Sequence, residues 1–186
     1  MPKHIHVVGL DEFNSEKLKR IDLPDGLSVH ALMACDEVKG RDTIDFNALL
    51  ETACQRLRTG DVPVHGIIGW WDFPTTSLVP QLCEAFALPG PSLESVLKCE
   101  HKYWSRLVQR EAIPDYIPGF CAVDPFADDP MSQVTLDYPF WIKPVKGFAS
   151  QLGFHIASDA DFEHAIRIIR AEIGRASVGK ECTLRC

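Results

Sequence analysis

A lysine within an apolar stretch is the first candidate for chemistry in this chain. Residues 138–145 (YPFWIKPV) are predicted to form a strand, because Pro144 forces Lys143 into an extended conformation. We expect Lys143 to point inward, where an ammonium costs free energy unless it meets an anion. The alternative is a lysine with a buried stem, whose ammonium reaches water beside an ordinary hairpin.

The loop after this strand offers further groups that could bind an anion. Residues 146–153 (KGFASQLG) contain the ammonium of Lys146, two glycines and the hydroxyl of Ser150. Backbone N–H groups in such a loop can surround a phosphate. The sequence therefore predicts a phosphate site with Lys143 on one side and the loop on the other.

A third lysine begins a predicted helix over residues 100–112, which Ile113 and Pro114 end. Lys102 stands in its first turn, where a cation opposes the helix dipole unless an anion binds there. The alternative is a solvated surface lysine. The helical spacing predicts that four side chains of this helix point inward: Tyr103, Trp104, Leu107 and Val108.

The elements that precede these lysines predict an open α/β sheet. Apolar runs predict strands at residues 5–10, 27–33 and 64–68. Amphipathic stretches predict helices at residues 42–58 and 75–87. This alternation of strand and helix is typical of a parallel sheet. No Gly-x-Gly-x-x-Gly follows the first strand and no Gly-x-x-x-x-Gly-Lys-Ser/Thr occurs, which disfavours a standard dinucleotide fold and a P-loop.

Ligands of such sheets bind beyond the carboxyl ends of the strands. This rule points to residues 9–11 and 71–72 as a rim that faces a ligand. The alternative is that Trp70 and Trp71 cover the core while Asp72 caps a turn. A dehydrogenase or small-molecule binder built on this sheet is a further hypothesis, which the absent glycine fingerprint weakens.

The chain is predicted to divide at the linker LPGPS, residues 88–92. We expect a Rossmann-like domain over residues 1–90 and a second domain over residues 91–174. Within the second domain, strands are predicted at 119–123 and 153–157, and Ser158 with Asp161 should form the capping box of a last helix. The tail, residues 175–186, has no periodicity and is predicted to be irregular.

Composition excludes several classes of function. The formal net charge of −7 argues against nucleic-acid binding and against an anionic membrane surface. No apolar run is long enough for a membrane span, and the N-terminus does not resemble a signal peptide. Seven scattered cysteines indicate reduced thiols in a cytoplasmic protein. His4 and His6 could ligate a metal from one strand, but no partner cluster is visible in the sequence.

From residue 88 onward the chain resembles the ATP-grasp superfamily of carboxylate–amine ligases. The resemblance rests on the order and spacing of several short motifs, more than on any one of them. They are the linker at 88–92, His101-Lys102 at a helix start, AIP at 112–114, YPFWIKP at 138–144, the loop at 147–153 and SDAD at 158–161. The first domain then corresponds to the smaller domain that precedes the grasp fold.

The resemblance implies that ATP is the ligand of these lysines. Lys102 matches a helix-start lysine that contacts nucleotide phosphates, and Lys143 matches a strand lysine that contacts phosphate oxygens. The residues that match the mobile loop over the phosphates are Gly147, Ala149, Ser150 and Gly153. His101 departs from the family, which usually has aspartate there, and the loop has fewer glycines than in many members.

Such ligases use ATP to activate a small-molecule carboxylate as an acyl phosphate, which an amine or similar nucleophile attacks. In the family a later half supplies the magnesium ligands, and the motifs of that half are absent from this sequence. We therefore expect a truncated, weak or inactive ATP-binding portion, with Mg²⁺ bound through the part that is lacking. The alternative is a non-catalytic binding or regulatory module, in which a partner chain covers the face that the later half would cover.

Overall fold

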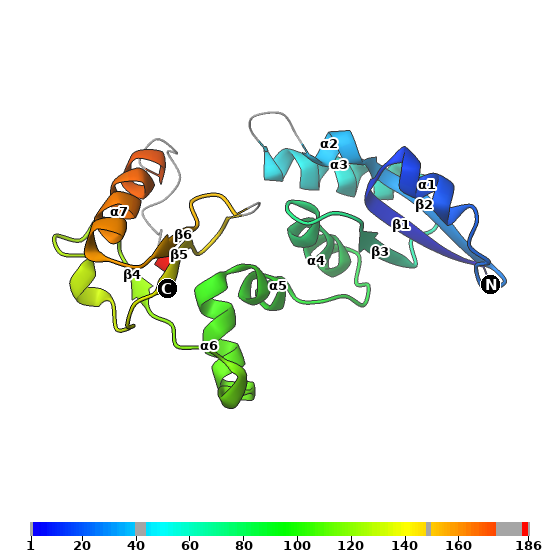
Figure 1. Cartoon of the computed structure of the whole chain (residues 1–186). Coiled ribbons are helices and arrows are strands. Elements are labelled where there is room, and N and C mark those ends of the chain that lie inside the picture. The colour runs from blue at the N-terminus through cyan, green and yellow to red at the C-terminus, as the bar shows by residue number, and fades with distance from the viewer. Residues whose placement is uncertain (1, 40–43, 148–149, 174–183, 186) are drawn as a thin grey trace. The chain divides into compact units, whose positions relative to one another are not determined.

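The structure is a computed structural model that describes residues 2–39, 44–147, 150–173 and 184–185. Its contacts divide the chain into two compact units, residues 1–97 and 98–186 (Figure 1). The division falls between Leu97 and Lys98, within helix α5 (Leu93–Glu100). The division predicted from the sequence lies earlier, at the linker of residues 88–92.

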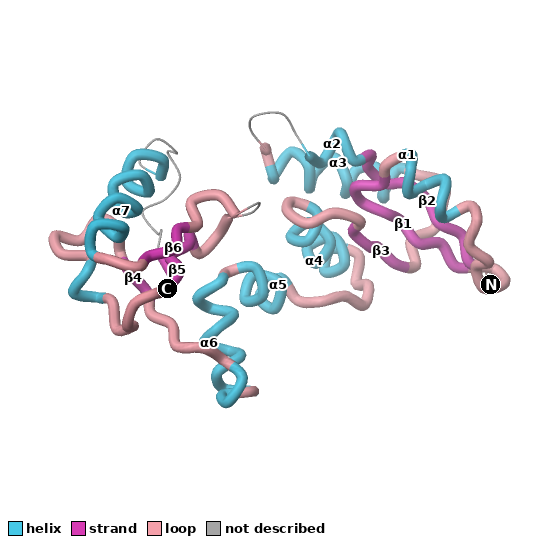
Figure 2. The backbone as a smooth tube through the Cα atoms, viewed as in Figure 1, coloured by secondary structure: helices cyan, strands magenta, loops and turns pink. Residues whose placement is uncertain are grey.

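The first unit is built on a parallel sheet of three strands, in the order β2-β1-β3. These strands are β1 (Lys3–Leu10), β2 (Leu27–Ala34) and β3 (Gly66–Gly69). Figure 2 shows them as the magenta segments of this unit. The predicted open α/β sheet is confirmed, with each strand within a few residues of its expected position.

Four helices accompany this sheet: α1 (Glu12–Leu18), α2 (Cys35–Lys39), α3 (Phe46–Thr59) and α4 (Thr75–Ala85). The two long helices, α3 and α4, are predicted, and the two short ones are too brief to show an apolar period. The Asp45 side chain caps α3 by accepting a hydrogen bond from the Ala48 N–H at 3.0 Å. Helices and sheet share one core, which includes Val8, Met33, Val38, Ala53, Leu57, Ile67, Leu78 and Leu82.

The second unit combines helices with an antiparallel sheet. Its helices are α6 (Lys102–Ala112) and α7 (Asp159–Ile173), with single 3₁₀ turns at Pro114–Tyr116 and Met131–Gln133. Its strands are β4 (Ala122–Val123), β5 (Phe140–Pro144), β6 (Phe154–Ile156) and β7 (Leu184–Arg185), in the order β4-β7-β5-β6.

Strand β7 is a correction to the sequence analysis, which predicts an irregular tail. Leu184 and Arg185 pair with both β4 and β5. Two residues are too few to show the alternation of a strand, and what places them is the pairing capacity of two edges far away in the sequence. The rest of the predicted tail, residues 175–183 and 186, lies outside the described residues.

Helix α7 anchors the core of the second unit. Its stripe of Phe162, Ala165, Ile166 and Ile169 is buried, as its spacing predicts. The predicted capping box is also confirmed, because the Asp161 N–H donates to the Ser158 hydroxyl at 3.3 Å and that hydroxyl donates to Asp161 Oδ2 at 2.9 Å. These bonds, and one from the Ala157 N–H, lower the pKa of the Asp161 carboxyl.

Two further findings concern the whole set of described residues. None of their helices combines the length and the apolar character that crossing a membrane requires. Cys35, Cys54, Cys83, Cys99 and Cys121 are free thiols.

Candidate anion-binding site

The side chains of strand β5 alternate between its two faces as predicted, but the face that carries Lys143 is the exposed one and not the buried one. Phe140 and Ile142 are buried in the core, where the Phe140 ring lies 6.4 Å from that of Phe162 on α7. Trp141 is 53% exposed and Lys143 is exposed on the same face. The prediction of an inward Lys143 is therefore wrong, because Phe140 and Ile142, on the opposite face, fill the core.

Two hydrogen bonds join the start of α6 to the chain directly after β5. The Lys102 backbone N–H donates to the Val145 carbonyl at 2.9 Å. The Lys102 ammonium donates to the Gly147 carbonyl at 2.8 Å. These bonds bring the helix lysine beside the strand lysine and give the ammonium a contact with the first glycine of the predicted phosphate loop.

His101 caps α6, which accounts for a histidine where the family usually has aspartate. Its Nδ1 accepts a hydrogen bond from the Trp104 N–H at 3.1 Å. A carboxylate oxygen would perform the same function at this position. The neutral imidazole keeps the cap without placing a negative charge beside Lys102.

Both predicted lysines line one pocket of about 590 Å³. Among the described residues, three cationic side chains and one carboxylate surround it, together with aromatic and apolar groups. The lining residues are Lys102, Arg106, Pro118, Gly119, Phe120, Leu136, Asp137, Pro139, Phe140, Trp141 and Lys143. Three cations against one anion make this pocket suited to a polyanionic ligand.

Arg106 is a site residue that the sequence analysis misses. It lies one helical turn after Lys102 on α6, and its Nη1 donates to Gln109 Oε1 at 3.0 Å. The signal was available, because residues four apart on a helix share a face and Lys102 was already a candidate. A guanidinium can also hold a phosphate through two parallel hydrogen bonds.

The other residues of the predicted phosphate loop do not belong to the pocket lining among the described residues. The ammonium of Lys146 lies 3.4 Å from Glu100 Oε2. Gly147 contacts Lys102, and a Cβ added at Gly153 would lie 3.7 Å from Lys143 Cγ. Ala149 lies outside the described residues.

Two non-glycine residues of this loop adopt the left-handed conformation. The φ angles of Ser150 and Leu152 are 58° and 52°. Glycine accepts this conformation without steric cost, whereas residues with a Cβ adopt it rarely. Leu152, which stands at a position where many family members are richer in glycine, therefore has a backbone that favours glycine here as well.

A tyrosine fixes the chain that leads into β5. The Tyr138 hydroxyl donates to Asp159 Oδ1 at 2.5 Å, at the start of α7. This bond raises the pKa of Tyr138 to about 12. The contact holds the segment on which Asp137 and Pro139 line the pocket.

The two segments of the predicted ligand rim in the first unit, residues 9–11 and 71–72, lie close together at Gly9 and Trp71. A Cβ added at Gly9 would lie 3.0 Å from Trp71 Cδ1, and the φ of Gly9 is +81°, so a glycine is required there. The Lys39 ammonium lies 3.5 Å from the centroid of the Trp71 ring. The carboxyl ends of β1 and β3 are thus adjacent, and ligand binding at this rim stays a prediction.

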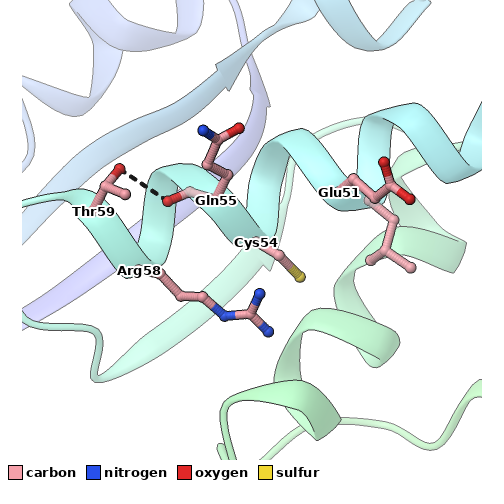
Figure 3. A pocket seen from close by; sticks show the side chains of 6 residues that line it. Glu51, Cys54, Gln55, Arg58 and Thr59 are labelled. Carbon is pink, nitrogen blue, oxygen red and sulfur yellow. Dashed lines mark hydrogen bonds between the residues drawn. The ribbon is translucent and has the colours of Figure 1, made fainter.

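A second pocket, in the first unit, lies along one side of α3 (Figure 3). Its volume is about 410 Å³, and it is lined by Leu50, Glu51, Cys54, Gln55, Arg58 and Thr59. The Thr59 hydroxyl donates to the Gln55 carbonyl of the same helix at 2.9 Å. Since one helix supplies every lining residue that the structure describes, these polar groups do not converge on a common point.

The described residues hold no group of three or more His, Cys, Asp or Glu side chains placed to bind a metal ion. The magnesium that the resemblance implies is therefore not assigned to side chains of this part of the chain.

Comparison with solved structures identifies the fold. An L-amino acid ligase from Bacillus licheniformis matches 99% of this chain with a TM-score of 0.67 and 17% sequence identity. A D-Ala:D-Ser ligase from Enterococcus faecalis matches 100% with a TM-score of 0.67 and 13% identity. Biotin carboxylase from Campylobacter jejuni, solved as a β-γ-ATP complex, matches 100% with a TM-score of 0.58 and 14% identity.

This chain has the fold of ATP-grasp ligases, and it corresponds to their N-terminal half. It spans 46%, 62% and 45% of the lengths of these three proteins, in the order given. No protein-family model and no curated protein sequence matches the chain.

Proposed function

We propose that the pocket of the second unit binds the phosphates of ATP, as part of an ATP-grasp ligase. The observation that carries the proposal is the placement of Lys102 and Lys143, which come from a helix and a strand and line one pocket. The fold supports it, since the solved structures with this fold include a nucleotide complex.

The groups of the pocket fit such a ligand. A nucleoside triphosphate carries roughly four negative charges. Lys102, Arg106 and Lys143 neutralise part of this charge, and Asp137 offsets one of the three cations. Phe120 and Trp141 supply flat apolar surfaces on which a nucleobase can stack.

The chemistry that ATP supplies in such a ligase is the activation of a carboxylate as an acyl phosphate, which an amine or similar nucleophile then attacks. The residues of this chain bind and orient the nucleotide. Lys102 exchanges its hydrogen bond to the Gly147 carbonyl for one to a phosphate oxygen. Lys143 and Arg106 fix the phosphate chain from the strand and from the next helical turn.

The full ligase reaction requires more than these groups. Magnesium ions neutralise much of the phosphate charge in phosphoryl transfer, and the proposed magnesium ligands lie in the part of the fold that this chain does not span. We therefore expect the chain by itself to bind ATP and to have weak or no ligase activity. The carboxylate substrate is a proposal of the same kind.

Titration of the full chain with ATP, by isothermal calorimetry, tests the proposal. Lys102→Met and Lys143→Met should each weaken ATP binding about ten- to hundredfold, since a charge-assisted hydrogen bond contributes about 1.5–3 kcal/mol. Arg106→Gln should weaken binding in the same direction. Arg167→Gln, on α7, removes a cation outside this pocket and serves as the matched control.

Unchanged ATP affinity in both lysine variants would overturn the assignment of the pocket. An equal loss in Arg167→Gln would also count against it, because the effect would then follow from net charge. Circular dichroism spectra that match the wild type establish that each variant is folded.

A further inference from the structure

Four of the seven histidines of the chain form one cluster in the first unit. His4 and His6 lie on β1, His30 lies on β2, and His65 directly precedes β3. The ring centroids are 5.2 Å apart for His4 and His30, 5.6 Å for His4 and His65, and 5.4 Å for His6 and His30. We call these four residues the histidine cluster.

Strand register brings the cluster together. His4 and His6 are two residues apart on β1 and therefore share one face of the sheet. His30 is the register partner of His6 on β2. On the other side of β1, the His65 N–H donates to the His4 carbonyl at 3.0 Å. The cluster thus spans all three chain segments at the amino-terminal end of the sheet.

The hydrogen bonds of the cluster determine which ring nitrogens carry a proton. The His4 backbone N–H donates to His65 Nδ1 at 3.2 Å, so this nitrogen carries no proton. His6 Nε2 lies 3.3 Å from the Pro63 carbonyl, which only accepts, so this nitrogen carries one. His4 Nδ1 and His30 Nε2 lie 3.0 Å apart and have room for one proton between them.

Additional protons disrupt these bonds. A proton on His65 Nδ1 would place two donors against each other and remove the bond to β1. A second proton between His4 and His30 would do the same across β1 and β2. Two imidazolium charges at ring distances near 5 Å also repel each other, most strongly where water is excluded.

No carboxylate among the described contacts of the cluster offsets such a charge. His6 is 8% exposed, and burial lowers its pKa, with smaller contributions in the same direction from His30, His4 and His65. On the elements packed against β1 and β2, Glu37 is paired with Arg56 at 2.6 Å, Asp36 accepts from the Glu37 N–H, and Lys39 lies over Trp71. Arg58 of α3 lies 5.9 Å from the Phe86 ring.

We propose that the histidine cluster is a pH-sensitive contact that holds the amino-terminal end of the sheet closed while its imidazoles are neutral. Acidification below the ordinary imidazole value of about 6.5 opens this end of the sheet. Residues 61–65 separate from β1, and β1 loosens from β2. The inference is independent of ATP binding in the second unit.

The sign follows from proton linkage. The open state binds protons more readily than the closed one, because burial lowers the pKa of His6 in the closed state and water reaches its ring once the sheet opens. For each additional proton bound on opening, the equilibrium constant for opening increases about tenfold per unit decrease of pH. The increase begins as the pH falls below the ordinary imidazole value of about 6.5.

Hydrogen exchange measured by mass spectrometry on the full chain, between pH 8 and 5.5 and corrected for intrinsic exchange rates, tests the proposal. Peptides that cover residues 3–10, 27–34 and 61–69 should open more as the pH falls below about 6.5, by up to about tenfold per unit decrease of pH for each proton bound. Peptides from α6 and α7 serve as internal references. His65→Gln and His30→Gln should reduce this pH dependence, and His164→Gln, on α7, should leave it unchanged.

Equal pH dependence in the two groups of peptides would overturn the proposal, as would an unchanged dependence in both cluster variants. If the variants do not fold, the nitrogen chemical shifts of the wild-type histidines at pH 7.5 decide. The proposal requires a bare Nδ1 on His65 and a protonated Nε2 on His6, and the opposite tautomers would contradict it.

Discussion

Helices α6 and α7 of the second unit have similar amphipathic sequences and opposite environments. Helix α7 buries Phe162, Ala165, Ile166 and Ile169. Helix α6 buries no residue, and its Trp104 and Val108 are 37% and 40% exposed. The prediction that these two side chains point inward is wrong, because periodicity identifies an apolar face but not what covers it.

The difference separates a helix that forms the core from one that presents functional groups. Helix α7 is stabilised along its length by packing on β5 and β6. At its first turn, helix α6 is held by the His101 cap and by the bonds from Lys102 to Val145 and Gly147, and Arg110 of its last turn lies 5.0 Å from the centroid of the Phe120 ring. The hydrogen bond of the Lys102 ammonium is one that a ligand can rearrange.

The largest expected effect is on stability, when one apolar side chain is shortened on each of these helices. Ile169→Ala should reduce the free energy of unfolding by about 2–5 kcal/mol, because Ile169 is fully buried and the change leaves a cavity. Val108→Ala on α6 should cost below about 1 kcal/mol, since the side chain is already partly in water. Urea unfolding followed by circular dichroism measures both, and equal losses would contradict the comparison.

The caps give a smaller and more specific effect. His101→Ala should cost about 1 kcal/mol of stability through loss of the α6 cap, and His101→Asp should retain the cap. Ser158→Ala provides the matched change on α7. Unfolding free energies at pH 7 check these values, and a loss in His101→Asp equal to that in His101→Ala would show that the cap does not matter.

Acidification should weaken the α7 cap only at low pH. The hydrogen bonds that Asp161 accepts from Ser158 and from the Ala157 N–H lower the pKa of its carboxyl. The Asp161 contribution is present above its ordinary value of 3.8 and disappears only as the pH falls below it. Hydrogen exchange of the first turn of α7 should therefore increase only below this pH. An increase that begins at a higher pH would contradict this assignment.

The smallest effect is expected at alkaline pH, at the start of α7. The hydrogen bond to Asp159 raises the pKa of Tyr138 from 10 to about 12. This bond contributes stability fully below pH 10, and the contribution is lost as the pH rises from 10 to 12. Absorbance at 295 nm should show one of the three tyrosines ionising late, and Tyr138→Phe should remove that step.

Local signals predicted the parts of the site that depend on neighbouring residues. Pro144 indicated the strand that carries Lys143, and the spacing of Ser158 and Asp161 indicated the α7 cap. The direction of Lys143 could not be predicted, because alternation defines two faces without showing which one meets the core. The histidine cluster and β7 could not be predicted either, because both depend on pairing between segments far apart in the sequence.

The central claim is that Lys102 and Lys143 hold the phosphate chain of a nucleotide in one pocket. Comparing the affinities of adenosine, AMP, ADP and ATP for the full chain tests it most directly. The account predicts that affinity increases with each phosphate in the wild type and that Lys102→Met with Lys143→Met removes this increase. Equal binding of adenosine and ATP by the wild type, or an undiminished increase in the double variant, would contradict it.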